Sequence, residues 1–96
     1  MIRRIPAFDA VSTKRLVILK SLLNRELDNG EVSTLTGMSR KTVYWHLNIL
    51  TDVGLIKSKK YQKLNLSPNS KRKTRDIFRM SLTLDGIEAI KYFGGD

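Results

Sequence analysis

The stretch GMSRKTVYWHLNIL, residues 37–50, decides the fold that we predict for this chain. Its glycine suits the left-handed residue that often ends a helix, and Ser39 suits the N-cap that begins the next one. Apolar residues then recur at helical spacing, at Val43, Leu47 and Leu50. The pattern predicts a sharp turn followed by a helix that ends near residue 52.

The two faces of this helix carry different chemistry. At 100° per residue the three apolar positions fall within about 60° of one another and predict a buried face. The opposite face gathers cations, an amide and an adjacent aromatic pair. Arg and Lys pair with guanine or phosphate, Asn with adenine, and ring surface with the thymine methyl in the DNA major groove. We therefore predict that this helix contacts DNA through Ser39, Arg40, Lys41, Thr42, Tyr44, Trp45 and Asn48.

Two residues of this helix have structural alternatives. Trp45 could pack against the predicted hairpin or a partner subunit, because large aromatic side chains are usually well buried. His46 lies at the flank of the buried face, which favours a structural histidine over a base reader or a pH switch.

Upstream, the sequence predicts an arm and two helices. Residues 1–11 lack periodicity and contain Pro6, so we expect an extended arm in which Arg3 and Arg4 add a phosphate contact. Leucines at helical spacing predict a first helix from Ser12 or Thr13 to about Leu27. Residues 28–30 would end that helix and cap a short second one over 31–36, with Val32 and Leu35 turned inward.

Downstream, the periodicity changes. Gly54 ends the third helix, residues 55–56 begin a strand, and alternation at Phe78, Met80 and Leu82 predicts a second strand. A polar, basic stretch between them predicts a turn or mobile loop. Thr83 can cap a last helix with an apolar stripe at Leu84, Ile87, Ile90 and Phe93. The order predicts an α+β fold in which residues 12–96 form one domain.

Residues 31–56, EVSTLTGMSRKTVYWHLNILTDVGLI, resemble the winged helix-turn-helix pattern of small prokaryotic ArsR- and MarR-type regulators. That pattern reads E-L-A-x-x-x-G-L-S-x-x-T-V-S-R-H-L-x-x-L-x-x-x-G-L-I. Residues 81–86, SLTLDG, are similar to the L-T-x-x-G that follows the wing in these families. The resemblance implies that residues 55–83 form a β-hairpin wing lying along the neighbouring minor groove or backbone. Tyr44 and Trp45 replace the common Ser-Arg pair, which leaves the base preference unpredictable.

The charge distribution supports a wing independently. The chain carries 18 Lys and Arg against 9 Asp and Glu, for a formal net charge of +9. Residues 57–79 contain nine of the cations and a single anion, Asp76. Such an excess favours a polyanionic partner. We predict wing contacts to DNA by Lys60, Lys63, Lys71, Arg72, Lys73 and Arg75; the alternative of a solvated, disordered loop is compatible, because such loops often order on binding.

The family implies dimerisation through the first and last helices. The last helix offers more apolar surface than one small core needs, so we predict a homodimer interface at Ile87, Ile90, Tyr92 and Phe93. The alternative is that this stripe closes the core of a monomer.

Together these features predict a sequence-specific regulator of transcription that binds double-stranded DNA. The alternative is a winged-helix interaction module, associated with nucleic acid or polymerase, without operator specificity. No nucleophile–base spacing, Gly-rich phosphate loop or H-E-x-x-H motif indicates an enzyme. The chain has no cysteine, which excludes thiolate metal sites, and its apolar runs fall short of the roughly 20 residues that span a membrane. We expect a cytoplasmic protein with no cofactor, metal or evident small-molecule effector.

Overall fold

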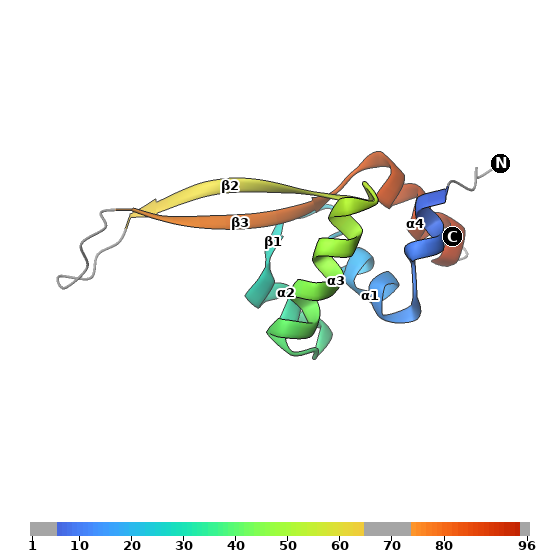
Figure 1. Cartoon of the computed structure of the whole chain (residues 1–96), viewed down its shortest axis with the longest axis horizontal. Coiled ribbons are helices and arrows are strands. Elements are labelled where there is room, and N and C mark those ends of the chain that lie inside the picture. The colour runs from blue at the N-terminus through green and yellow to red at the C-terminus, as the bar shows by residue number, and fades with distance from the viewer. Residues whose placement is uncertain (1–5, 65–73, 95–96) are drawn as a thin grey trace.

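The computed structural model describes residues 6–64 and 74–94. Within them, a short 3-10 helix precedes four α-helices and three strands (Figure 1). Their bounds are η1 Pro6–Ala10, α1 Thr13–Ser21, β1 Leu27–Asp28, α2 Asn29–Thr36, α3 Arg40–Asp52, β2 Ile56–Leu64, β3 Thr74–Leu82 and α4 Leu84–Gly94. The predicted α+β fold, with three helices, a hairpin and a last helix, is confirmed.

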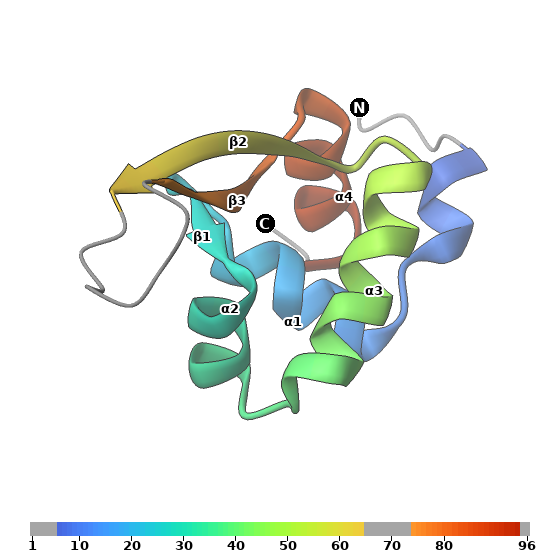
Figure 2. The same cartoon turned by 60° about the vertical axis from the view of Figure 1, so that its left-hand side comes forward.

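The sheet is antiparallel with strand order β1-β3-β2. The long strands pair in unbroken register, from Ile56 opposite Leu82 at the base to Leu64 opposite Thr74 at the outer end. The much shorter β1 pairs with the base of β3, which places Leu27 opposite Met80. The hairpin of β2 and β3 therefore projects away from the helices (Figures 1 and 2).

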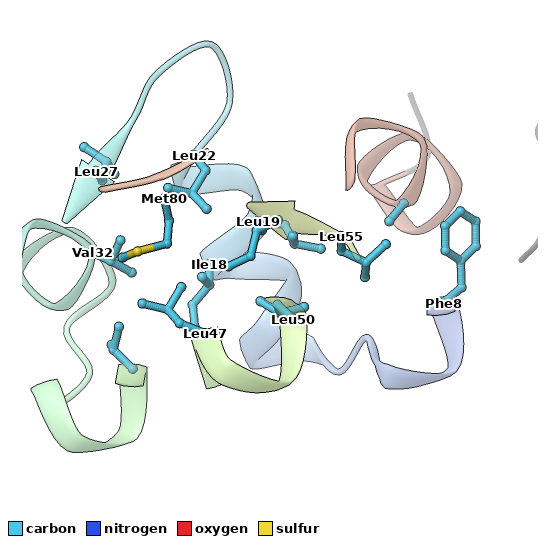
Figure 3. Packing of buried hydrophobic residues seen from close by; sticks show 13 residues of the cluster. Phe8, Ile18, Leu19, Leu22, Leu27, Val32, Leu47, Leu50, Leu55 and Met80 are labelled. Atoms are coloured by element: carbon cyan, nitrogen blue, oxygen red, sulfur yellow. The ribbon is translucent and has the colours of Figure 1, made fainter. Parts of the chain in front are cut away.

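One apolar core lies between the helices and the base of the hairpin (Figure 3). The predicted inner face of α3 is confirmed, because Val43 and Leu50 are fully buried and Leu47 is 5% exposed. The other buried core residues come from η1, α1, β1, α2, the hairpin and α4: Phe8, Ile18, Leu19, Leu22, Leu27, Val32, Leu55, Ile56, Met80 and Ala89. The hairpin enters this core only through its base.

The first helix is shorter than predicted. It ends at Ser21, and Asn24 adopts a left-handed conformation with φ of 61°, which Asn tolerates better than most residues. Leu27 fits the helical spacing, but the chain instead pairs it with Met80 in β1. Leu23, which the helical pattern also included, is 44% exposed.

The prediction of an extended arm is wrong for Pro6–Ala10, which form η1. Phe8 is 1% exposed, and its ring centroid lies 5.3 Å from that of Tyr92 and 5.8 Å from that of Phe93. A single aromatic residue has no periodicity, so local patterns could not reveal this packing. Arg3 and Arg4 lie outside the described residues.

Two inward orientations were also wrong. Leu35 is 53% exposed on α2, and Leu84, the first residue of the predicted stripe, is 81% exposed. The buried residues of α4 are instead Gly86 and Ala89. A Cβ on Gly86 would overlap the carbonyl oxygen of Leu55, so the absence of a side chain lets α4 pack directly on the start of the hairpin. The predicted Thr83 cap is confirmed, because its hydroxyl accepts from Gly86 N at 3.1 Å.

Candidate nucleic-acid interface

Capping interactions fix α2 and the turn that precedes α3. The Asp28 carboxylate accepts from Glu31 N at 2.8 Å, and the Glu31 carboxylate accepts from Asp28 N at 3.1 Å. Gly37 ends α2 with φ of 73°, as predicted. The Ser33 hydroxyl donates to Met38 O across the turn at 2.6 Å. These bonds set the angle at which α3 leaves α2.

The start of α3 uses two of the predicted contact residues for its own cap. Ser39 Oγ accepts from Thr42 N at 3.2 Å and donates to Thr42 Oγ1 at 2.9 Å. Thr42 thus replaces the Glu or Gln of a capping box by a hydroxyl–hydroxyl bond. Both residues position the helix, whatever further contact they make.

The other predicted residues of α3 lie together on its outer surface. Tyr44 is 61% exposed and Trp45 57% exposed, with Lys41 and Asn48 exposed beside them. Arg40 lies at the N-terminal end of α3, close to Gly30 of α2. A Cβ added to Gly30 would be 3.1 Å from Arg40 Nη2. Two aromatic rings, two cations and an amide therefore share one solvent-facing surface.

Within the described residues, Trp45 lies outside the buried core, and its ring contacts are to Arg15 and His46. The Arg15 guanidinium lies over its ring, 5.3 Å from the centroid, and the His46 ring lies 4.9 Å away. His46 is 6% exposed, and its Nδ1 accepts from Arg15 Nε at 3.1 Å, which agrees with the structural role predicted for it. Burial, and then the charges of Arg15 and Lys14, lower the pKa of His46.

A groove of about 640 Å³ separates α3 from the hairpin. Its lining includes Arg40, Tyr44 and Asn48 on one side and Ile77, Phe78 and Met80 on the other. Phe78 is 54% exposed there and was not among the predicted contact residues. Its alternation with Met80 indicated the core face, but the hairpin carries Phe78 beyond the edge of the core.

Three of the six cations predicted for the wing lie on the described strands of the hairpin. Lys60 pairs with Phe78 across the strands, and its Nζ lies 3.6 Å from the Asp76 carboxylate, which partly neutralises it. Lys63 and Arg75 occupy paired positions near the end of the ribbon. Lys71, Arg72 and Lys73 lie outside the described residues.

Polar contacts that the sequence did not predict fasten the base of the hairpin. Arg79 Nη2 donates to Glu26 O at 2.9 Å and lies 3.2 Å from Glu31 Oε1. The Tyr61 hydroxyl donates to Glu26 Oε1 at 2.7 Å, and this hydrogen bond is the main reason why the pKa of Tyr61 is raised. We call Glu26, Glu31, Tyr61 and Arg79 the hairpin clamp. It ties both long strands to the segment that begins the helix-turn-helix.

The residues predicted to form a dimer interface are divided between two environments. Ile87 and Ile90 are half-buried, and Ile90 packs against the core. Tyr92 and Phe93 remain 38% and 39% exposed, although both contact Phe8. The homodimer stays a prediction.

Residues 12–58 match the model of the bacterial regulatory protein, arsR family. This segment contains α1, the helix-turn-helix and the start of the hairpin. The chain is a winged helix-turn-helix protein. The predicted resemblance is confirmed, and the hairpin of β2 and β3 is its wing.

Solved winged-helix structures agree with this assignment. The zinc-responsive MarR family member ZitR of Lactococcus lactis is 22% identical, with a TM-score of 0.66 over 88% of this chain and 52% of that one. MepR of S. aureus in complex with DNA is 20% identical, with a TM-score of 0.64 over 92% and 64%. PadR of Bacillus subtilis with operator DNA is 17% identical, with a TM-score of 0.66 over 84% and 46%. The chain thus spans about half the length of several structures that it matches.

The likeness to these solved structures shows the winged-helix fold, and the family match covers the helix-turn-helix within it. No curated protein matches the chain in sequence. Among residues 6–64 and 74–94, no three His, Cys, Asp or Glu side chains are grouped so that they could hold a metal ion. No helix in this same part of the winged-helix chain is long and apolar enough to cross a bilayer.

Proposed function

We propose that this protein regulates transcription by binding double-stranded DNA, with α3 in the major groove and the wing on the adjacent backbone or minor groove. The observation that carries the proposal is the contrast between the faces of α3. Val43, Leu47 and Leu50 are almost completely buried, whereas Tyr44 and Trp45 are more than half exposed. Adjacent exposed aromatics beside cations form a contact surface for a partner rather than part of the core.

Charge and shape favour DNA as that partner. The major groove is wide enough to admit one helix, and Lys41 and Asn48 carry groups that pair with base edges or phosphate. The wing segment adds the largest excess of cations in the chain, which suits the phosphate backbone. In this arrangement α3 selects the sequence and the wing contributes affinity for any duplex, with Arg3 and Arg4 as an additional phosphate contact. An unchanged salt dependence after deletion of residues 1–5 would remove the arm from this scheme.

We further propose that the protein acts as a homodimer whose interface includes Ile87, Ile90, Tyr92 and Phe93. The partial exposure of the two aromatics supports the proposal, because they leave apolar area on α4 after the core has formed. In a two-fold dimer, two α3 helices would read half-sites about one turn, ~34 Å, apart. A monomeric mass by light scattering at tens of micromolar protein would overturn this part.

The deciding experiment is selection from a random-sequence duplex pool at near-physiological salt. An enriched inverted repeat with half-sites one turn apart is the expected result. Enrichment of one unpaired motif would keep the regulator but remove the dimer. Retention of DNA without enrichment would contradict sequence-specific binding and favour the alternative, an interaction module that binds nucleic acid or polymerase without an operator.

A further inference from the structure

One aromatic residue of the proposed contact surface, Trp45, is contacted by a residue of another helix. Arg15, on α1, is half-buried and its guanidinium lies over the Trp45 ring. A guanidinium at 5.3 Å from an indole centroid is within the range of a cation–π interaction. Trp45 remains 57% exposed, so the ring is contacted but not covered.

Arg15 is itself fixed by two hydrogen bonds. Its Nη1 donates to Ala10 O at 2.6 Å, at the end of η1, and its Nε donates to His46 Nδ1 at 3.1 Å. The guanidinium is planar, so two bonds to fixed acceptors determine the orientation of the whole group. His46 accepts through Nδ1 and must therefore be neutral, with its proton on Nε2. The Arg15 guanidinium thus connects η1, α1 and α3 beside the Trp45 ring.

We propose that Arg15 is a positioning residue that holds the indole of Trp45 in one orientation for contact with base edges. The inference rests on the proposed function and deepens it, because it names a residue that sets sequence preference without reading a base. A free indole on a helix surface would sample several rotamers and would lose that freedom on binding. A ring that is already oriented avoids this cost and distinguishes base edges by shape, as in contact with a thymine methyl.

The competing explanation is that Arg15 contributes only its positive charge. Lysine separates the two, because it keeps the charge but lacks the planar group that bonds Ala10 and His46 while lying over the ring. Arg25 provides a matched control. Its Nε donates to Ser21 O at 2.7 Å, so Arg25→Lys makes the same chemical change at an arginine that bonds within its own segment and not to Trp45 or His46.

The test uses Trp45 as its own reporter, because it is the only tryptophan in the chain. Acrylamide quenching and fluorescence anisotropy are measured for wild type, Arg15→Lys and Arg25→Lys in the absence of DNA. Affinities for the selected duplex and for random duplex are then measured for the same proteins. We expect Arg15→Lys to make Trp45 about twofold more accessible to the quencher and to lower the preference for the selected duplex about tenfold, with unchanged binding to random duplex. Arg25→Lys should change neither quantity.

A second background tests whether the effect passes through Trp45. In Trp45→Ala protein, adding Arg15→Lys should alter the preference less than twofold. An equal loss in both backgrounds, or quenching and preference like those of wild type, would overturn the proposal. Arg15→Gln replaces Arg15→Lys if the latter fails to fold by circular dichroism; because Gln also removes the charge, only a lowered preference with unchanged binding to random duplex then supports the positioning role, and weaker binding to both duplexes overturns it. If wild type selects no duplex, the proposed function fails, whereas the quenching comparison still decides whether Arg15 orients the ring.

Discussion

The two proposed DNA-contacting elements are held in place by different kinds of interaction. Three nearly or fully buried apolar residues attach α3 to the core along its length. The wing enters the core only at its base, where the polar hairpin clamp connects it to Glu26, just before β1, and to Glu31 on α2. Base readout needs side chains placed to within a fraction of a hydrogen-bond length, whereas phosphate contacts tolerate more variation. The difference therefore indicates a division of labour in which the better anchored element selects the sequence.

The largest expected effect is that of Gly86→Ala. This substitution acts where α3 and the wing meet and therefore affects both elements alike. The new Cβ would overlap the Leu55 carbonyl oxygen and lie 3.1 Å from its carbon. Backbone atoms cannot yield as a flexible side chain does, so we expect a loss of about 3–5 kcal/mol in unfolding free energy. Thermal melting should show Tm lower by roughly 15 °C or more. Gly94→Ala, whose Cβ would meet Lys20 Cε at 3.5 Å, is the control and should melt like wild type.

The second effect concerns the wing alone. Replacing Lys71, Arg72 and Lys73 by alanine should weaken binding to every duplex by roughly 100-fold at low salt and reduce the slope of log K against log salt by about 2–3. Fluorescence titration at several salt concentrations measures both. Lys91→Ala, on the exposed side of α4, tests whether any lost cation has this effect. A slope unchanged in the triple variant would show that these three residues do not contact phosphate.

The third effect should have the opposite pattern. Asn48→Ala removes an exposed amide from α3, and we expect about tenfold weaker binding to the selected duplex with random duplex unaffected. The salt slope should stay within experimental error of the wild-type value. Equal losses on both duplexes would mean that Asn48 contacts the backbone and that the proposed division between α3 and the wing is wrong.

A smaller effect tests whether the hairpin clamp directs the wing. Arg79→Met removes the contacts to Glu26 O and Glu31 and should cost about 1 kcal/mol in stability. We expect random-duplex affinity to fall several-fold more than in Lys57→Met, which removes an exposed cation from the same strand pair. The preference for the selected duplex should be retained. If the two variants bind alike, the clamp serves stability alone.

The smallest expected effect is a pH dependence of the stability, which acts through His46 on α3. The folded-state pKa of His46 lies below its ordinary value of 6.5, so the unfolded chain takes up a proton more readily. This contribution to stability is present above pH 6.5 and is lost as the pH falls below it. Because His46 is the only histidine, a fall in Tm between pH 7.5 and 5.5 reports on it. Arg15→Gln removes one cause of the shift and should reduce the fall; an equal fall would exclude that coupling.

The same contrast between local and distant interactions explains what the sequence could predict. The caps and apolar spacing of α3 are local, so its bounds and both faces could be predicted. Arg15 and His46 are 31 residues apart, Tyr61 and Glu26 are 35 apart, and Arg79 and Glu26 are 53 apart. No local pattern links such pairs, and the positioning of Trp45 and the wing was therefore missed. Leu27 shows the opposite case. Its spacing fits a helix, but its pairing with the distant Met80 places it in β1.

Thr83, at the end of the wing, bonds to the residues at which the wing begins. Its hydroxyl donates to Gly54 O at 2.6 Å and its amide donates to Leu55 O at 3.1 Å, so the chain leaves and re-enters the helical body at adjacent positions. The entropy of closing a loop grows only slowly with its length once its ends are fixed. The outer part of the wing can therefore change in length and composition during evolution while the helical core stays folded. A lineage could exchange its outer part, or an engineer graft another, provided that Ile56 and Leu82 keep their pairing and that Met80 and the hairpin clamp are retained.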